Sequence, residues 1–179
     1  MREMFLSPHN DDESLFGAFT ILRHKPSVYF VTRSVKQAER GITYQQRDEE
    51  SRQALQVLGA EIQFLNIPEP ELDVYKLTNI LKEINSKRKI KVVYAPAFQG
   101  GHNHHDIVCL AAEKVFGNKV IHYATYTKYN LTPKGNIELF PTKEELDFKN
   151  RALACYRSQL PWNHRHFDAV KDKSEYWIE

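Results

Sequence analysis

Short apolar segments alternate along the chain with longer segments of helical periodicity, and this alternation restricts the fold more than any other feature. Runs rich in β-branched and aromatic residues predict strands at Met4–Ser7, Ser27–Ser34, Glu61–Ile67, Lys91–Ala97 and Lys119–Thr127. Apolar residues spaced three and four apart predict helices at Arg47–Leu58, Leu72–Ser86 and Asp106–Phe116. Because strands joined by crossover helices pair in parallel, the sequence predicts an α/β fold with a mostly parallel sheet and helices on both faces.

This arrangement is Rossmann-like, although the chain lacks the G-x-G-x-x-G loop that binds dinucleotides. After the fifth predicted strand the pattern changes, and we expect a hairpin around Lys134–Gly135 and a last helix at Lys143–Gln159. The tail Pro161–Glu179 has a mixed pattern that predicts no element. With 179 residues and no obvious linker, the chain is expected to form a single domain over residues 1–179.

Composition excludes several classes of function. The net charge is only +2, so no strong field for a nucleic acid is expected, and strand alternation explains the clustered tyrosines Tyr123, Tyr126 and Tyr129. No run approaches the ~18 apolar residues of a membrane span. Cys109 and Cys155 lie in apolar patterns typical of core residues in a reducing compartment. With no signal-peptide pattern at the N-terminus, we expect a cytoplasmic protein, and homo-oligomerisation stays open.

A cluster of one histidine and three acids, His9, Asp11, Asp12 and Glu13, directly follows the first predicted strand. Adjacent carboxylates repel one another, and a bound cation would remove that repulsion. Taken alone, Asp11 or Asp12 could instead cap a helix that begins at Ser14. In parallel sheets, however, ligands bind outside the carboxyl ends of strands, which is where this cluster lies.

A second cluster, with His102, His104 and His105, follows the fourth predicted strand and precedes a predicted helix. If the two strands are near neighbours, His9, Asp12 and one of these histidines can bind the same ion. Two imidazoles and a carboxylate with an open fourth position are typical of a catalytic zinc site. Asp11 would then lie beside the metal, where it could take a proton from water, so the pattern predicts a hydrolase.

Four motifs in this order resemble those of one family. "SPHNDDE" is similar to the (A/S)-P-H-x-D-D-E signature of the LmbE/PIG-L family of zinc-dependent N-acetylglucosaminyl deacetylases, and "HNHH" resembles its H-x-D-H motif. "RDEESRQALQVLG" resembles its R-x-x-E-x-x-x-A-x-x-x-L-G helix, and "RALACYRSQ" resembles a late helix that ends in S-Q. The resemblance extends from Ser7 to Gln159 and implies an LmbE-like fold.

The resemblance implies that His9, Asp12 and His105 bind Zn²⁺, a donor set that Fe²⁺ can also occupy. It implies that Asp11 is the general base and that His102 stabilises the tetrahedral oxyanion, as an imidazolium. The implied reaction removes the N-acetyl group from a small-molecule N-acetylglucosamine-type conjugate and releases acetate and a free amine.

The same resemblance assigns Arg47 to contact with the sugar or its attached group, and Glu13 to support of the turn. Two positions depart from the family: His104 replaces the aspartate of H-x-D-H, and Gly100 stands where some relatives carry a tyrosine. These departures and the short region after Gln159 leave two alternatives open: a metal amidohydrolase for another acyl-amide, or a catalytically weak sugar-binding or regulatory protein. No role is expected for the histidines His24, His122, His164 and His166, although the last two could line a pocket.

Overall fold

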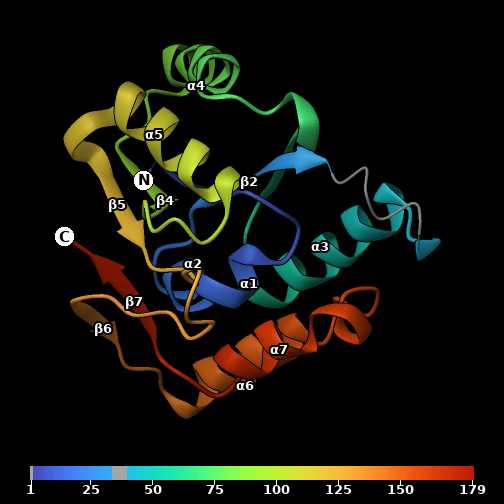
Figure 1. The fold of residues 1–179 in the computed structure, drawn as a ribbon. Coiled ribbons are helices and arrows are strands. Elements are labelled where there is room, and N and C mark those ends of the chain that lie inside the picture. Colours follow the sequence, from blue (N-terminus) through green and yellow to red (C-terminus); the bar gives the residue numbers. More distant parts are fainter. Residues whose placement is uncertain (1, 34–39) are drawn as a thin grey trace.

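The computed structural model describes residues 2–33 and 40–179 and contains one seven-stranded sheet (Figure 1). Its strands are β1 (Glu3–Ser7), β2 (Ser27–Arg33), β3 (Ile62–Pro68), β4 (Val92–Pro96), β5 (Val120–Tyr123), β6 (Ile137–Leu139) and β7 (Glu175–Ile178). They are arranged in the order β3-β2-β1-β4-β5-β7-β6. The pairs from β3 to β5 are parallel, whereas β7 runs antiparallel to β5 and β6. The predicted mostly parallel, Rossmann-like sheet is confirmed.

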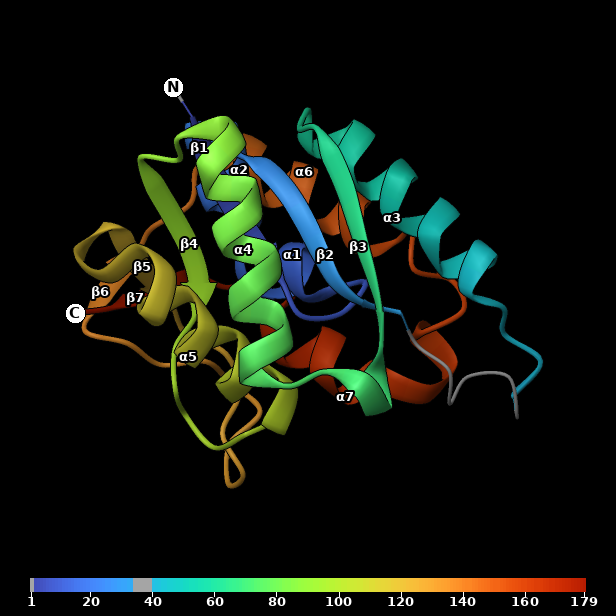
Figure 2. The same ribbon diagram turned by 90° about the horizontal axis from the view of Figure 1, so that it is seen from above.

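Helices cover both faces of the sheet, as predicted (Figures 1 and 2). One face carries α1 (Asp12–Phe16), α2 (Ala18–His24), α3 (Tyr44–Leu58), α6 (Lys143–Leu153) and α7 (Leu160–Val170), and the other carries α4 (Val74–Arg88) and α5 (Asn103–Phe116). Side chains alternate between the faces along each strand. In β1, Phe5 packs into the core under the first group of helices, and Met4 and Leu6 pack under α4 and α5.

The strand order reverses direction between β1 and β4, which are paired in parallel with Met4 opposite Val93. The chain moves outward from β1 to β2 and β3, and then returns to the other side of β1 to form β4 and β5. At such a switch point the loops after the two strands diverge and leave a crevice at their carboxyl ends. The residues that follow Ser7 and Pro96 therefore border a shared crevice.

The C-terminal third differs from prediction. The expected hairpin around Lys134–Gly135 is wrong, because β6 pairs with β7 far along the chain, with Leu139 opposite Glu175. The helix expected at Lys143–Gln159 ends at Leu153 and a new one, α7, begins at Leu160. Pro161 lies in the first turn of α7, where proline is tolerated because its missing N–H would have no partner within the helix.

The unassigned tail forms α7 and β7, and a buried ion pair ties β7 to the helical layer. Lys149 Nζ lies 3.0 Å from Glu175 Oε1, and the other carboxylate oxygen accepts a hydrogen bond from the backbone N–H of Phe19. Both side chains are shielded from water, so each charge is compensated by the other. This contact fixes the last strand against α2 and α6.

Three further expectations concern the chain as a whole. Cys109 is buried as predicted and Cys155 is partly buried, and both are free thiols. Within the part of the chain that the structure describes, every helix is too short or too polar to cross a membrane. The single-domain organisation stays a prediction.

Candidate metal centre and pocket

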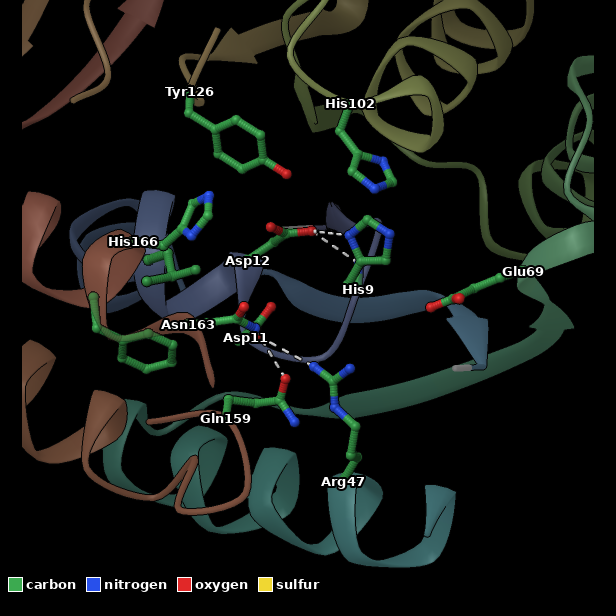
Figure 3. A pocket seen from close by; sticks show the side chains of 12 residues that line it. His9, Asp11, Asp12, Arg47, Glu69, His102, Tyr126, Gln159, Asn163 and His166 are labelled. Atoms are coloured by element: carbon green, nitrogen blue, oxygen red, sulfur yellow. Dashed lines mark hydrogen bonds and ion pairs between the residues drawn. The ribbon is translucent and has the colours of Figure 1, made fainter. Parts of the chain in front are cut away.

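A pocket with a volume of about 240 Å³ lies at the carboxyl ends of β1 and β4 (Figure 3). The turn after β1 forms its floor, and α3 and the start of α5 border it. On the opposite side, α7 and the segment after β5 complete the wall. The two histidine-containing clusters, which lie far apart in the sequence, meet here because their strands are neighbours.

His9, Asp12 and His105 converge within this site. Nδ1 of His9 lies 3.0 Å and Nε2 of His105 lies 3.1 Å from the same carboxylate oxygen, Oδ2 of Asp12. One ligand atom from each residue lies within 4.8 Å of the others. Burial raises the pKa of Asp12, but the facing His105 and His9 outweigh it and hold that pKa well below its usual value. A compact, buried set of two imidazoles and a carboxylate fits a divalent cation such as zinc.

The remaining ring nitrogen of each histidine has an orienting partner. Nδ1 of His105 lies 3.2 Å from Oγ1 of Thr125, and Nε2 of His9 lies 2.9 Å from Nδ1 of His104. Such partners fix the tautomer and the ring plane of a metal-binding histidine. His104 therefore contacts a candidate ligand. With His102, these two residues also form an overlapping group of potential ligands.

Asp11 lies beside the candidate metal-binding group of His9, Asp12 and His105 in a constrained backbone conformation, with a φ of 132°. Its backbone N–H donates to Oε2 of Glu13, and its Oδ2 accepts from Nη2 of Arg47 at 3.2 Å. Arg47 also donates to the backbone carbonyl of Asn10. Burial raises the pKa of Asp11 well above its ordinary value, and Arg47 only partly opposes this rise. An elevated pKa is the property that a general base near neutral pH requires.

Glu13 supports the turn after β1, as the family resemblance implies, by accepting a hydrogen bond from the backbone N–H of Asp11. It is fully buried, and its Oε1 accepts hydrogen bonds from the hydroxyls of Tyr156 at 2.5 Å and Ser14 at 2.6 Å. Burial raises the pKa of Glu13 to about 7. A second link between motifs joins Glu50 of α3 to Ser158, whose N–H and hydroxyl both donate to it. The motif residues thus hold one another in place around the pocket.

His102 differs from the imidazolium that was expected. It is the N-cap of α5, and its Nδ1 accepts a hydrogen bond from the backbone N–H of His104 at 3.1 Å. Burial and the neighbouring His9 lower the pKa of His102 to about 3. A neutral ring that accepts through Nδ1 carries its proton on Nε2. Asp106, the nearest acid in the sequence after His102, accepts hydrogen bonds from the backbone N–H groups of Gln99 and Gly100.

The far wall of the pocket is formed by Tyr126, Gln159, Asn163 and His166. Sequence reasoning named only His166 as a residue that could line a pocket and missed Tyr126, Gln159 and Asn163. Tyr126 lies beyond the end of β5, and its hydroxyl points toward the candidate metal-binding group (Figure 3). The other three are polar residues at spacings of four and three, a pattern that places them on one face of a helix. That spacing could have identified them. His164 and His24 are exposed.

The loop before His102 brings Tyr126 into the pocket. A Cβ atom added to Gly101 would lie 2.1 Å from the backbone oxygen of Tyr126. Only a glycine permits this approach, so the loop after β4 and the segment after β5 pack directly against each other. Tyr126 also lies near both His105 and His166, with ring centroids 5.4 Å and 4.9 Å away.

Comparison with known proteins gives one family and several related folds. The model of the PIG-L family, described as GlcNAc-PI de-N-acetylase, matches residues 4–116. The solved structure of the zinc-inhibited form of a teicoplanin deacetylase is 16% identical, with a TM-score of 0.77 over 94% of this chain and 90% of that one. No curated protein matches the chain.

Two further structures show the range of activities found on this fold. The N,N'-diacetylchitobiose deacetylase from Pyrococcus horikoshii is 19% identical, with a TM-score of 0.70 over 90% of this chain and 72% of that one. The 4-carboxy-2-hydroxymuconate hydratase from Pseudomonas putida is 15% identical, with a TM-score of 0.73 over 95% and 83%. At such identities the likeness establishes the fold alone, and an activity has to be argued from the site.

Proposed function

The chain belongs to the PIG-L family, and on this premise we propose that it is a zinc-dependent deacetylase that removes the N-acetyl group from an N-acetylglucosamine-type conjugate. The observation that carries the proposal is the convergence of His9 and His105 on one oxygen of Asp12, with the carboxylate of Asp11 beside them at the floor of a pocket. The candidate metal ligands and the candidate base thus line the same pocket.

His9, Asp12 and His105 are the residues that would hold the ion. When bound, zinc supplies a Lewis acid that polarises the carbonyl of the scissile amide. Fe²⁺ could fill the same donor set. Thr125 and His104 keep the two imidazoles oriented for this role through their contacts with His105 and His9.

Asp11 moves the proton. Its carboxylate accepts a proton from the water that attacks the amide carbon, and it then returns this proton to the leaving nitrogen, so that acetate and a free amine are released. Its raised pKa suits both steps near neutral pH. Arg47 holds the carboxylate in position through the ion pair at 3.2 Å. Arg47 also lines the pocket, which supports a contact with substrate.

Two neutral donors stabilise the oxygen of the former carbonyl. His102 donates through Nε2–H, since its Nδ1 accepts from the backbone. Tyr126 approaches from the other side (Figure 3), and burial raises the pKa of its hydroxyl far above the ordinary value, so the hydroxyl keeps its proton. Tyr126 would thereby supply the hydroxyl that some relatives place at the position of Gly100. Donors aimed at developing negative charge are a large source of catalysis.

The pocket favours a single amino-sugar unit. Its volume of about 240 Å³ lies below the usual range of roughly 300–1,000 Å³ for small-molecule sites, so one sugar with its acetyl group would fill it. The amides of Gln159 and Asn163 offer both donors and acceptors for sugar hydroxyls. The group attached to the sugar would then extend beyond the pocket, past Glu69 at its margin.

The proposal is tested by acetate release from N-acetylglucosamine conjugates, before and after chelation and after zinc is restored. We expect activity to disappear with the metal and to return with it. Asp11→Asn should reduce turnover by at least a hundredfold while zinc stays bound, whereas His105→Ala should lose the zinc itself. Activity of the chelated protein equal to that of the zinc-loaded protein would exclude the metal from the mechanism.

A panel of substrates separates this proposal from the alternatives. N-acyl amines without a sugar should have a kcat/KM at least tenfold lower than amino-sugar conjugates. A preference for such amines would instead indicate a different amidohydrolase. Tight binding of zinc and sugar without any acetate release would indicate a binding protein.

A further inference from the structure

We propose that Cys109, Glu113 and His122 form a second cation site, separate from the pocket, that binds Zn²⁺. Cys109 and Glu113 lie on α5 and His122 lies on β5 beneath it. Each residue offers one ligand atom, and the three atoms lie within 4.8 Å of one another. None of these residues lines the pocket described above.

The separations of the three side chains suit a tetrahedral ion. Oε1 of Glu113 lies 3.9 Å from Sγ of Cys109 and 3.3 Å from Nε2 of His122. Sγ of Cys109 lies 3.7 Å from Nδ1, the other ring nitrogen of His122, so the imidazole would have to turn for Nε2 to face both other ligands. Bond lengths of about 2.0–2.3 Å around zinc place neighbouring ligand atoms about 3.3–3.8 Å apart. A cation can therefore enter between these groups with small side-chain adjustments.

The secondary structure explains why the three residues meet. Cys109 and Glu113 are four residues apart, so they lie on the same face of α5, one turn from each other. His122 points toward that face from the neighbouring strand. Its Nδ1 also lies 3.3 Å from the backbone oxygen of Pro96, to which it can donate its proton. That hydrogen bond leaves Nε2 as the ligand atom, the usual arrangement for a metal-binding histidine.

The exposure of the three side chains increases from Cys109 to His122 to Glu113. Cys109 is 1% exposed, whereas the side chains of His122 and Glu113 are 21% and 50% exposed. An ion would enter from the side of Glu113 and keep a position open to water. Sulfur together with nitrogen selects zinc over Mg²⁺ and Ca²⁺, which prefer oxygen ligands.

Zinc binding here would replace a proton. Burial, together with the nearby Glu113, raises the pKa of the Cys109 thiol to about 12, so the free protein carries a neutral thiol. A coordinating thiol is deprotonated, with its proton released to water as the ion binds sulfur, and affinity should therefore rise with pH. The bound ion would tie the C-terminal half of α5 to β5. Because the first turn of α5 contains the candidate ligand His105, this clamp would stabilise the helix that completes the pocket.

Cobalt(II) distinguishes the two sites, because only the second contains a thiol. Reduced, metal-free protein is titrated with Co²⁺, and we expect a thiolate-to-cobalt charge-transfer band in the near ultraviolet whose final intensity corresponds to one Co²⁺ per chain at the thiol site, with the pocket taking up further cobalt without such a band. Cys109→Ser should abolish the band. Cys155→Ser, at the other free cysteine, is the matched control and should leave it unchanged.

A variant of the pocket separates this proposal from the proposed function. Asp12→Asn should lower total cobalt binding without changing the charge-transfer band, whatever the outcome for deacetylation. If Cys109→Ser does not fold, Glu113→Gln at the exposed side should fold and weaken the affinity at this site by at least tenfold. No band in the wild-type protein at a hundredfold excess of Co²⁺, a band that survives in Cys109→Ser, or an unchanged affinity in Glu113→Gln would each overturn the proposal.

Discussion

Arg47 reaches from α3 to the turn after β1, where its Nη2 lies 3.2 Å from Oδ2 of Asp11 and also donates to the backbone of Asn10. Both charged side chains are buried. A buried charge is tolerated when its partner is present and becomes a liability when the partner is removed. The proposed base and its positioning residue should therefore be coupled in stability as well as in activity.

A double-mutant cycle measures this coupling. Arg47→Met leaves the buried carboxylate of Asp11 uncompensated and should lower the free energy of unfolding by about 3 kcal/mol. Adding Asp11→Asn should recover part of that loss, with a coupling of about 1–3 kcal/mol in urea unfolding at fixed zinc concentration. Arg52→Met, at an exposed position of the same helix, is the control, and its free energy of unfolding should stay within about 0.5 kcal/mol of the wild-type value. Strict additivity of Arg47→Met and Asp11→Asn would contradict the ion pair.

His104 should tune metal affinity through its contact with His9. Removing the side chain in His104→Ala deprives Nε2 of His9 of its partner at 2.9 Å, and zinc affinity should fall about 10–100-fold. His104→Asp should restore most of that affinity, because a carboxylate also accepts from an imidazole N–H. Competition with a chromophoric chelator measures both variants. Equal affinities of wild type and His104→Ala would mean that the contact does not orient His9.

Tyr126→Phe removes only the hydroxyl that faces the metal-binding group. We expect kcat to fall about 10²-fold with little change in KM, because the lost hydrogen bond acts mainly on the developing oxyanion. Tyr129→Phe is the matched control, since Tyr129 is 89% exposed, and it should retain wild-type rates. An increase in KM at constant kcat would instead assign Tyr126 to substrate binding.

Gly101→Ala tests the close packing of the loop after β4. The new methyl group would lie 2.1 Å from the backbone oxygen of Tyr126, so the backbone must move. We expect this movement to lower the free energy of unfolding by about 1–3 kcal/mol. Activity should fall with stability, because Tyr126 moves with that segment. Gly100→Ala provides a comparison: it has a positive φ but open space around it, so its cost of about 1 kcal/mol should leave activity unchanged. A free energy of unfolding for Gly101→Ala equal to that of the wild type would contradict this packing.

The ion pair between Arg23 and Glu145 predicts a pH-dependent stability. Hydrogen bonds from Nε of Arg23 at 2.6 Å and Nη2 at 2.9 Å lower the pKa of Glu145 from 4.5 to about 2. The pKa of Glu145 is lower in the folded protein than in the unfolded chain. The ion pair therefore contributes its full stabilisation above pH 4.5, and this stabilisation is lost as the pH falls through about 2. Glu145→Gln should therefore destabilise the protein at pH 7 by up to about 1 kcal/mol, with the difference vanishing near pH 2.

Unfolding of both proteins between pH 2 and 7 measures this effect. Glu144→Gln, at the exposed position next to it in α6, should show no comparable pH dependence. A penalty for Glu145→Gln that stays constant down to pH 2 would show that the charge of Glu145 is not its source.

The N-terminal part of the fold could be predicted because its signals are local. Apolar runs fixed β1 to β4 within a few residues, and Gly59 stops α3 at Leu58 as its position predicts. The His9 and His105 clusters could be brought together from topology alone, since each follows a strand of a parallel sheet. The local sequence pattern was therefore enough to predict the fold where each element packs against elements that are close to it in the sequence.

The C-terminal part resisted prediction because its contacts are distant in sequence. Nothing near Glu175 indicates that it pairs with Leu139 or binds Lys149, and the alternation around Tyr126 gave no sign that the strand ends at Tyr123. The charge state of His102 also depends on burial and on a backbone N–H donor, neither of which its residue type reveals.

The division of the pocket between two stretches of chain has an evolutionary consequence. His9, Asp12 and His105 lie within residues 4–116, whereas Gln159 and His166 belong to the segment that follows, anchored by its own strand. The residues proposed to cleave the amide and those proposed to select the sugar can thus change independently of each other during evolution. Grafting the final helix and strand of one relative onto the scaffold of another should transfer sugar preference without rebuilding the catalytic floor.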